Sequence, residues 1–159
     1  MLLEISSKQR LSKGGWRVTK KKLKQYGALR KEIEIIDDKL DKLYERQSNI
    51  PTVMGKVTGS SSEFPYIEVH TTVQMDEPGE ADSVKKLISI KKARKKQVSA
   101  VMIEIEQFIA GIPDSIDRQI FELTYLEKKK QREVAEIVGL EQSSISKRIT
   151  SYLKLSYNS

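Results

Sequence analysis

The sequence predicts a mainly α protein in which long, heptad-patterned helices form a coiled coil or a helical hairpin, with a small β-containing insertion and a C-terminal helix-turn-helix. Three observations predict this fold class. Two stretches carry apolar residues spaced three and four apart, a segment between them alternates apolar and polar residues, and a glycine-centred pattern lies near the C-terminus. With 159 residues but only three Phe, one Trp and six Tyr, the chain suits one small domain with an extended arm better than a large core.

The composition argues against an enzyme. The chain has no cysteine and a single histidine, His70, so it lacks thiolate metal sites and most histidine-based catalysis. It also shows no nucleophile–base set, phosphate loop or metal-ligand cluster. We therefore expect no catalytic residues, no metal and no cofactor.

The net charge of +7 and the absence of a long apolar run bear on partners and location. A basic chain is typical of proteins that bind polyanions, although a solvated basic face explains charge alone equally well. No stretch approaches the roughly 20 apolar residues that span a bilayer, and the first residues turn polar too soon for a signal peptide. We expect a cytoplasmic protein with no membrane partner.

After an N-terminal arm at residues 1–15, the sequence predicts one helix over residues 16–50. Trp16 begins it, either as a core anchor or, with Arg17 and Lys20–Lys24, as a contact to the backbone of a polyanion. Pro51 ends it because the residue before proline avoids the α region. The heptad seam consists of Tyr26, Leu29, Ile33, Ile36, Leu40 and Leu43.

A second long, basic helix is expected over residues 84–112, ended by Gly111 and Pro113. The cations of residues 91–96 cover every face of nearly two turns, so this part is expected to project into solvent or toward a partner. Its seam consists of Val84, Leu87, Lys91, Arg94, Val98, Val101, Ile105, Phe108 and Ile112. Neither helix can bury its seam alone. They are expected to pack as an antiparallel hairpin, on a second copy of the chain, or both, with a homodimer favoured.

Residues 51–83 are rich in Gly, Ser and Pro and differ from both helices. Apolar residues at 67, 69, 71, 73 and 75 alternate with polar ones, which is typical of a strand. A strand here needs a partner, such as residues 53–58, or a helix face. The alternatives are a β-hairpin and a long loop with little β structure.

Residues 113–159 carry the most specific pattern, that of a helix-turn-helix. Asp114 and Ser115 can cap a first helix, a second is expected over residues 131–138, and a third over residues 142–155. With Gln131 counted as the first position, a small residue (Ala135) is fifth, a glycine (Gly139) is ninth and a β-branched residue (Ile145) is fifteenth. The small residue lets the two helices approach closely, the glycine makes the turn, and the β-branched residue packs the second helix on the first. The predicted core is Val134, Ala135, Val138, Gly139, Leu140, Ile145 and Ile149.

The third helix is expected to read double-stranded DNA in the major groove. Its face opposite the core carries side chains that can hydrogen-bond base edges. The candidate base contacts are Gln142, Ser143, Ser146, Lys147 and Thr150.

Nearby cations are the candidate contacts to DNA phosphates. They are Lys128, Lys129, Lys130, Arg132 and Arg148. Because residues 114–159 have a net charge of only +1, DNA binding is expected to need a dimer, the basic helix at residues 91–96, or RNA polymerase as a further anchor.

The runs 117–125, 132–140 and 144–149 resemble region four of bacterial sigma factors. More broadly, residues 19–155 resemble phage-encoded late transcription regulators of the RinA and ArpU type, chiefly through Gly59–Tyr66 and Pro113–Arg148. The resemblance implies a phage or prophage activator of late genes in the bacterial host cell, with bacterial RNA polymerase as a further partner.

Three residues depart from the region-four pattern. Lys128 stands where a glycine is common, Lys130 where a Ser or Thr cap is usual, and Glu141 where a Ser commonly caps the recognition helix. Two other functions remain open: a small DNA-recognition subunit of a phage packaging terminase, and a sigma-like RNA polymerase adaptor.

Overall fold

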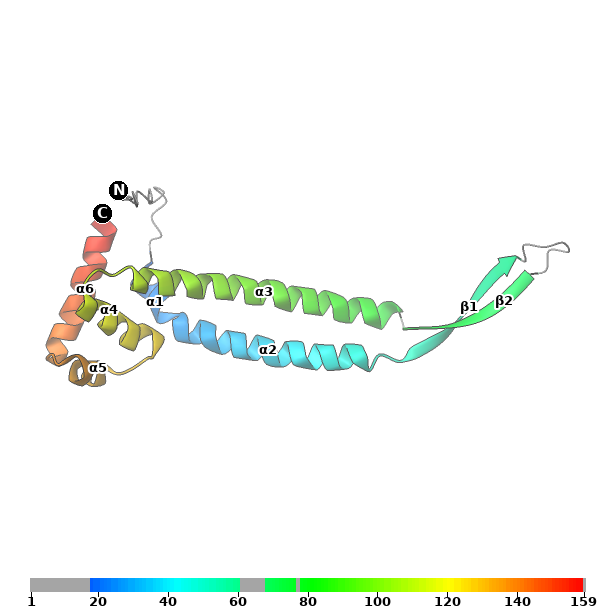
Figure 1. Cartoon of the computed structure of the whole chain (residues 1–159), viewed down its shortest axis with the longest axis horizontal. Coiled ribbons are helices and arrows are strands. Elements are labelled where there is room, and N and C mark those ends of the chain that lie inside the picture. Colours follow the sequence, from blue (N-terminus) through cyan, green and yellow to red (C-terminus); the bar gives the residue numbers. More distant parts are fainter. Residues whose placement is uncertain (1–17, 61–67, 77, 159) are drawn as a thin grey trace, which may run out of the picture. The chain divides into compact units, whose positions relative to one another are not determined.

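The structure, a computed structural model, describes residues 18–60, 68–76 and 78–158. This part of the chain is mainly helical and divides into two compact units (Figure 1). Unit 1 comprises the described residues up to Arg30 together with those from Ala100 onward, and unit 2 comprises Lys31–Ser99. The predicted N-terminal arm and Trp16 lie outside the described residues.

The first predicted helix is two helices, so the expectation of one helix over residues 16–50 was wrong. Helix α1 spans Lys20–Lys24 and α2 spans Tyr26–Ser48. The Thr19 hydroxyl caps α1 by accepting from the Lys22 amide at 3.1 Å. The Gln25 amide donates to the Lys22 carbonyl at 3.1 Å, a tighter turn that separates the two helices.

Helix α3 spans Pro78–Ala110, so it begins six residues before the predicted start at Val84. Pro78 suits this start, because proline is favoured at the first position of a helix, where its missing N–H has no intrahelical acceptor. Glu80 adds a carboxylate in the first turn, where the helix dipole favours negative charge. The predicted stop near Gly111 is confirmed.

Between α2 and α3 the backbone forms two strands, β1 (Thr52–Ser60) and β2 (Glu68–Asp76). They pair antiparallel, with Thr52 opposite Asp76 and Ser60 opposite Glu68. Part of the Gly59–Tyr66 motif falls between the strands, outside the described residues.

In unit 2, α2 and α3 bury a shared apolar cluster, consistent with the hairpin alternative. Ile36 and Leu40 of α2 are buried in one cluster with Val84 and Ile88 of α3. Ile50, which follows α2, belongs to the same cluster. Ion pairs flank the cluster. They are Arg46–Glu80 at 3.0 Å, Arg94–Glu32 at 2.7 Å and Lys95–Asp37 at 2.6 Å.

The predicted seam of α3 was wrong over one turn. Ile88 is 7% exposed, whereas Leu87, the predicted seam residue, is 40% exposed. Val84, Ile88 and Val98 are buried. The helical spacing between Ile88 and Val98 places two lysines, at 91 and 95, on the same side of the helix. The apolar seam of unit 2 is therefore interrupted.

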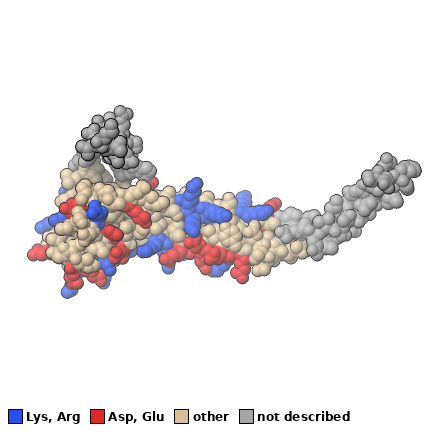
Figure 2. All heavy atoms as spheres, in the orientation of Figure 1, with Lys and Arg blue, Asp and Glu red and all other residues tan. Residues whose placement is uncertain are grey.

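The basic segment at residues 91–96 was predicted to project into solvent or toward a partner, but three of its side chains contact α2 of the same chain. Arg94 and Lys95 form ion pairs with α2, and the Lys92 ammonium lies 5.6 Å from the centre of the Tyr44 ring. Within unit 2, Figure 2 shows cations gathered along the α3 edge and carboxylates along the α2 edge. The charge of this segment is partly neutralised by its neighbour.

The rest of unit 1 consists of short helices. They are α4 (Ser115–Phe121), the π-helix η1 (Glu122–Leu126), α5 (Gln131–Val138) and α6 (Gln142–Asn158). Ile105 and Ile109 at the end of α3, and Ile112 just after it, are buried in one cluster with residues of these helices. This core holds the candidate site in place.

Candidate nucleic-acid interface

Helix α4 begins at the predicted cap. The Asp114 carboxylate accepts from the Asp117 amide at 2.8 Å, which satisfies one of the helix's unpaired N–H groups. The Arg118 guanidinium donates to the Ile112 carbonyl at 2.8 Å. This bond joins α4 to the segment that follows α3.

The turn after η1 contains the first departure from the region-four pattern. Lys128 has φ 55°, the left-handed conformation that glycine adopts at low cost. The next amide, that of Lys129, donates to the Leu123 carbonyl at 2.9 Å and closes the turn. Lysine therefore occupies a glycine-type position.

Helix α5 has the predicted bounds, residues 131–138. The Glu133 carboxylate accepts from the Lys130 amide at 2.9 Å, which is half of a capping box. An ammonium group accepts no hydrogen bond, so Lys130 does not supply the other half. One capping bond thus compensates for the missing Ser or Thr.

Gly139 makes the turn between α5 and α6, as predicted. Its φ of 71° is left-handed, and its amide and that of Leu140 both donate to the Ala135 carbonyl. After this turn α6 begins at Gln142 and continues three residues beyond the predicted end at Leu155.

The predicted core residues lie in one cluster. Val134 and Ile145 are fully buried, Ala135 and Ile149 nearly so, and Val138 and Leu140 pack against them. Gly139, also predicted for the core, is exposed and acts only in the turn.

An aromatic group extends this core. Its rings are Phe108, Phe121, Tyr125 and Tyr152, with neighbouring centroids 5.4–6.3 Å apart.

All five candidate base contacts are exposed on α6 (Gln142, Ser143, Ser146, Lys147 and Thr150). The core side of the same helix is buried at Ile145, Ile149 and Leu153. One helix therefore presents an apolar side to the core and an uncovered polar side. Lys147, the charged residue among the five, forms no ion pair within the described part of the chain.

The candidate phosphate contacts differ in exposure and pairing. Lys128, Lys130 and Arg132 are exposed, and Lys129 is partly buried. Lys129 lies 3.6 Å from the Glu127 carboxylate, and Arg132 lies 3.6 Å from Glu136. These two pairs are loose, so both cations remain accessible to an anion of higher charge.

Arg148 has an intramolecular role that the sequence prediction missed. Its guanidinium donates to the Asp117 carboxylate at 2.8 Å and lies 3.7 Å from Asp114. The hydrogen bond with Asp117 raises the pKa of Arg148 above its usual value. Two carboxylates thus hold the predicted phosphate contact against the N-terminus of α4.

Sequence reasoning also missed α1 as part of this unit. Leu23 is fully buried and Val18 is 1% exposed, both in the cluster that contains Ile145 and Ile149. Two side-chain pairs join the same region to α3, Lys22 with Glu104 and Tyr26 with Glu106. Leu23 continues the heptad spacing three residues before Tyr26, which is the signal that could have found it.

Helix α1 also changes the charge of the unit. Its sequence, KKKLK, contributes four lysines and no carboxylate. Residues 114–159, by contrast, carry eight Lys and Arg against seven Asp and Glu. Within unit 1, the lysines of α1 therefore add to the weak positive charge of the C-terminal segment.

Comparison with protein-family models, curated proteins and solved structures finds no match to this chain. In the part of the chain that the structure describes, no helix has the length and apolar character needed to cross a membrane.

Proposed function

We propose that this protein is a sequence-specific, DNA-binding transcriptional regulator. It reads the major groove with the exposed face of α6, in a helix-turn-helix formed by α5, Gly139 and α6. The observation that carries the proposal is the uncovered polar side of α6, set on a helix whose other side is fully packed.

The residues on that face suit base recognition. The Gln142 amide can pair bidentately with adenine, and the Lys147 ammonium can donate to guanine O6 and N7. The hydroxyls of Ser143, Ser146 and Thr150 can bond bases or phosphates. Because α6 is anchored by buried residues, these groups meet DNA from a fixed position.

The positive charge needed for the DNA backbone comes from two places. Lys128, Lys129, Lys130 and Arg132 lie before or within α5, and α1 supplies the lysines described above. Arg148 is left out of this group because Asp117 and Asp114 hold its guanidinium.

The biological setting follows from the resemblance given above. We propose a phage or prophage late-gene activator that acts in the bacterial cytoplasm, contacts RNA polymerase and forms a homodimer through its helices. In unit 2, Ile35 and Ile90 are 47% and 53% exposed, so apolar surface remains for a second copy.

The test is capture of fragmented host and phage DNA by the full-length protein at about 150 mM salt, where nonspecific binding is weak, followed by sequencing. A double variant, Gln142→Ala/Lys147→Ala, is compared with the wild type. The matched control is Gln97→Ala/Lys39→Ala, which removes the same residue types at exposed positions of unit 2.

We expect one sharp peak upstream of an operon for the wild type and the control, and its loss in the α6 variant. A flat profile for the wild type, or a peak that the α6 variant retains, would contradict base reading by α6.

A further inference from the structure

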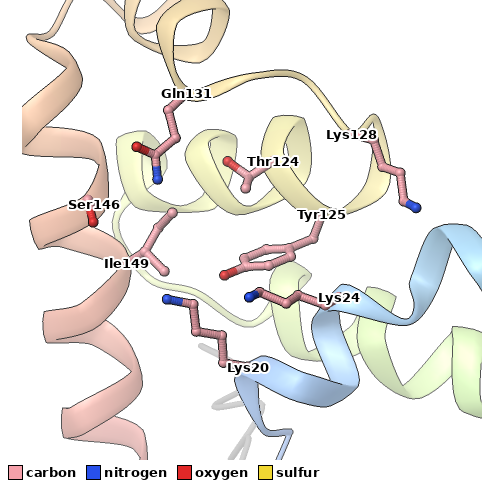
Figure 3. Close-up of a pocket in the computed structure, with 8 residues that line it drawn as sticks. All are labelled: Lys20, Lys24, Thr124, Tyr125, Lys128, Gln131, Ser146 and Ile149. Carbon is pink, nitrogen blue, oxygen red and sulfur yellow. The ribbon is translucent and has the colours of Figure 1, made fainter.

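Unit 1 contains a cavity of about 320 Å³ beside α6 (Figure 3). It is bounded by α1, η1, the turn after η1, α5 and α6. Tyr125 and Ile149 give it an apolar wall, and Ser146 of α6 lies at its edge. Figure 3 shows the ends of Lys20 and Lys24 turned toward Tyr125 and Ile149, whereas the end of Lys128 points away.

The charge at this cavity is positive and unbalanced. Lys20 and Lys24 lie one turn apart on α1, and no carboxylate among the described residues pairs with either. Lys22, which does not line the cavity, pairs with Glu104. Like charges at this spacing repel each other, and an anion bound between them would remove this repulsion.

The polar groups of the cavity are those that an oxyanion needs. The Thr124 hydroxyl oxygen is buried and has no hydrogen-bond partner in the described part of the chain. The Gln131 amide and the Ser146 hydroxyl add further donors, and no acidic residue lines the cavity. Two ammonium groups with amide and hydroxyl donors match a phosphate group.

The position of the cavity favours the DNA backbone as the source of that phosphate. Ser146 belongs both to the cavity and to the face of α6 that we assign to base reading. An anion held there lies beside the bases that this face would contact, where the backbone of the same duplex runs.

We propose that this cavity binds a phosphate group of the DNA backbone, held by Lys20 and Lys24. The inference rests on the proposed function and adds α1 to the DNA-binding surface. It adds residues 20–24 to an interface that is otherwise formed by the last third of the chain.

The experiment measures binding of the full-length protein to a labelled random duplex of about 30 base pairs across a range of salt concentrations. The test variant is Lys20→Gln/Lys24→Gln. The control, Lys39→Gln/Lys86→Gln, removes the same charge at exposed lysines of unit 2, outside the cavity. Circular dichroism confirms that each variant is folded.

We expect the test variant to bind the duplex roughly tenfold more weakly, since a charge-assisted contact is lost. The slope of log affinity against log salt should fall by about one, as for one phosphate contact. The control should change both quantities far less. Lys20→Arg/Lys24→Arg should restore binding because it keeps both charges.

A second arm follows the backbone amide signals of Thr124 and Ser146 by nuclear magnetic resonance, with the duplex or with inorganic phosphate alone. The proposal expects the duplex to shift both signals. Shifts with inorganic phosphate but not with the duplex would overturn it in favour of a free anion.

Unchanged duplex binding by the test variant would overturn the cavity assignment alone and leave the proposed function standing. No duplex binding by the wild type would overturn both.

Discussion

Arg148 of α6 and Asp117 of α4 are joined by a hydrogen-bonded ion pair of 2.8 Å between the guanidinium Nη1 and the carboxylate Oδ1. The side chain of Asp117 is 19% exposed and that of Arg148 is 39% exposed. The pair fixes α6 to the N-terminus of α4 on the side away from the proposed DNA-reading face. It therefore adds to the apolar contacts of Ile145, Ile149 and Leu153 that orient α6 within unit 1.

A double-mutant cycle tests this pair. Asp117→Asn and Arg148→Gln should each lower the urea midpoint slightly, and the double variant should lose little more than either single variant, because both remove one interaction. The coupling should weaken in high salt, which screens exposed charges. Strictly additive losses would mean that the two residues act independently.

The burial of Leu23 predicts that the first described helix stabilises the C-terminal helices. Leu23→Ala should lower the free energy of unfolding by about 2–5 kcal/mol, since a fully buried leucine leaves a cavity when truncated. Urea denaturation followed by circular dichroism measures it. Ile137→Ala, at a position 55% exposed on α5, is the control and should cost far less. Equal losses would argue against α1 as part of the core.

Local patterns in the sequence were enough to place the C-terminal helices. Gly139 and the residues around Ala135 and Ile145 have spacings set by a single turn and a single helix contact, so the bounds of α5 and the buried positions could be predicted. Asp114 was predicted as a cap for the same reason. Each of these interactions joins residues no more than ten positions apart in the chain.

Features that depend on distant residues could not be predicted in this way. Leu23 is buried in one cluster with residues more than 80 positions later, and the carboxylate that holds Arg148 lies 31 residues away. Both Leu87 and Ile88 fit a helical repeat, and only the packing of α2 decides which is buried. Within the candidate site, the exposed face of α6 followed from periodicity. The lysines of α1 were one of two alternatives for this segment in the sequence, and their position beside α6 required the tertiary fold.

The left-handed turn at Gly139 gives a further prediction. Gly139→Ala should destabilise the protein by about 1–2 kcal/mol, because a Cβ at φ 71° is strained even though no atom lies within 4 Å of it. Gly79→Ala in α3 also meets no atom and has no positive φ, so it should be neutral or stabilising by up to about 1 kcal/mol. Thermal unfolding of both variants checks the opposite signs. A neutral effect at Gly139 would contradict the left-handed turn.

Lys128 should show the reverse effect. Lys128→Gly should raise stability by about 1 kcal/mol relative to Lys128→Ala, since only glycine adopts φ 55° without strain. The alanine variant is the matched control because it removes the same charge and keeps a Cβ. Chemical denaturation of the two variants gives the difference. If alanine proved as stable as glycine, the turn would not be strained at this residue.

Ionisation of Tyr26 should lower the stability of unit 1 at alkaline pH. Burial, together with the hydrogen bond to Glu106, raises the pKa of Tyr26 to about 12, above the value near 10 expected for the unfolded chain. Folding therefore favours the neutral phenol, and this contribution is fully present below about pH 10 and is lost as the pH rises through about 12.

Urea midpoints of the wild type and Tyr26→Phe, measured from neutral to alkaline pH, test this dependence. The wild type should be the more stable protein below about pH 10, and its advantage should shrink above that pH as tyrosinate forms. Tyr44→Phe, at a position 41% exposed in unit 2, serves as the control for removal of a phenol hydroxyl. A gap between the wild type and Tyr26→Phe that stays constant across this range would show that the Tyr26 hydroxyl does not titrate with the fold. A gap that closes would locate the alkaline sensitivity at the contact between the start of α2 and the end of α3 within unit 1.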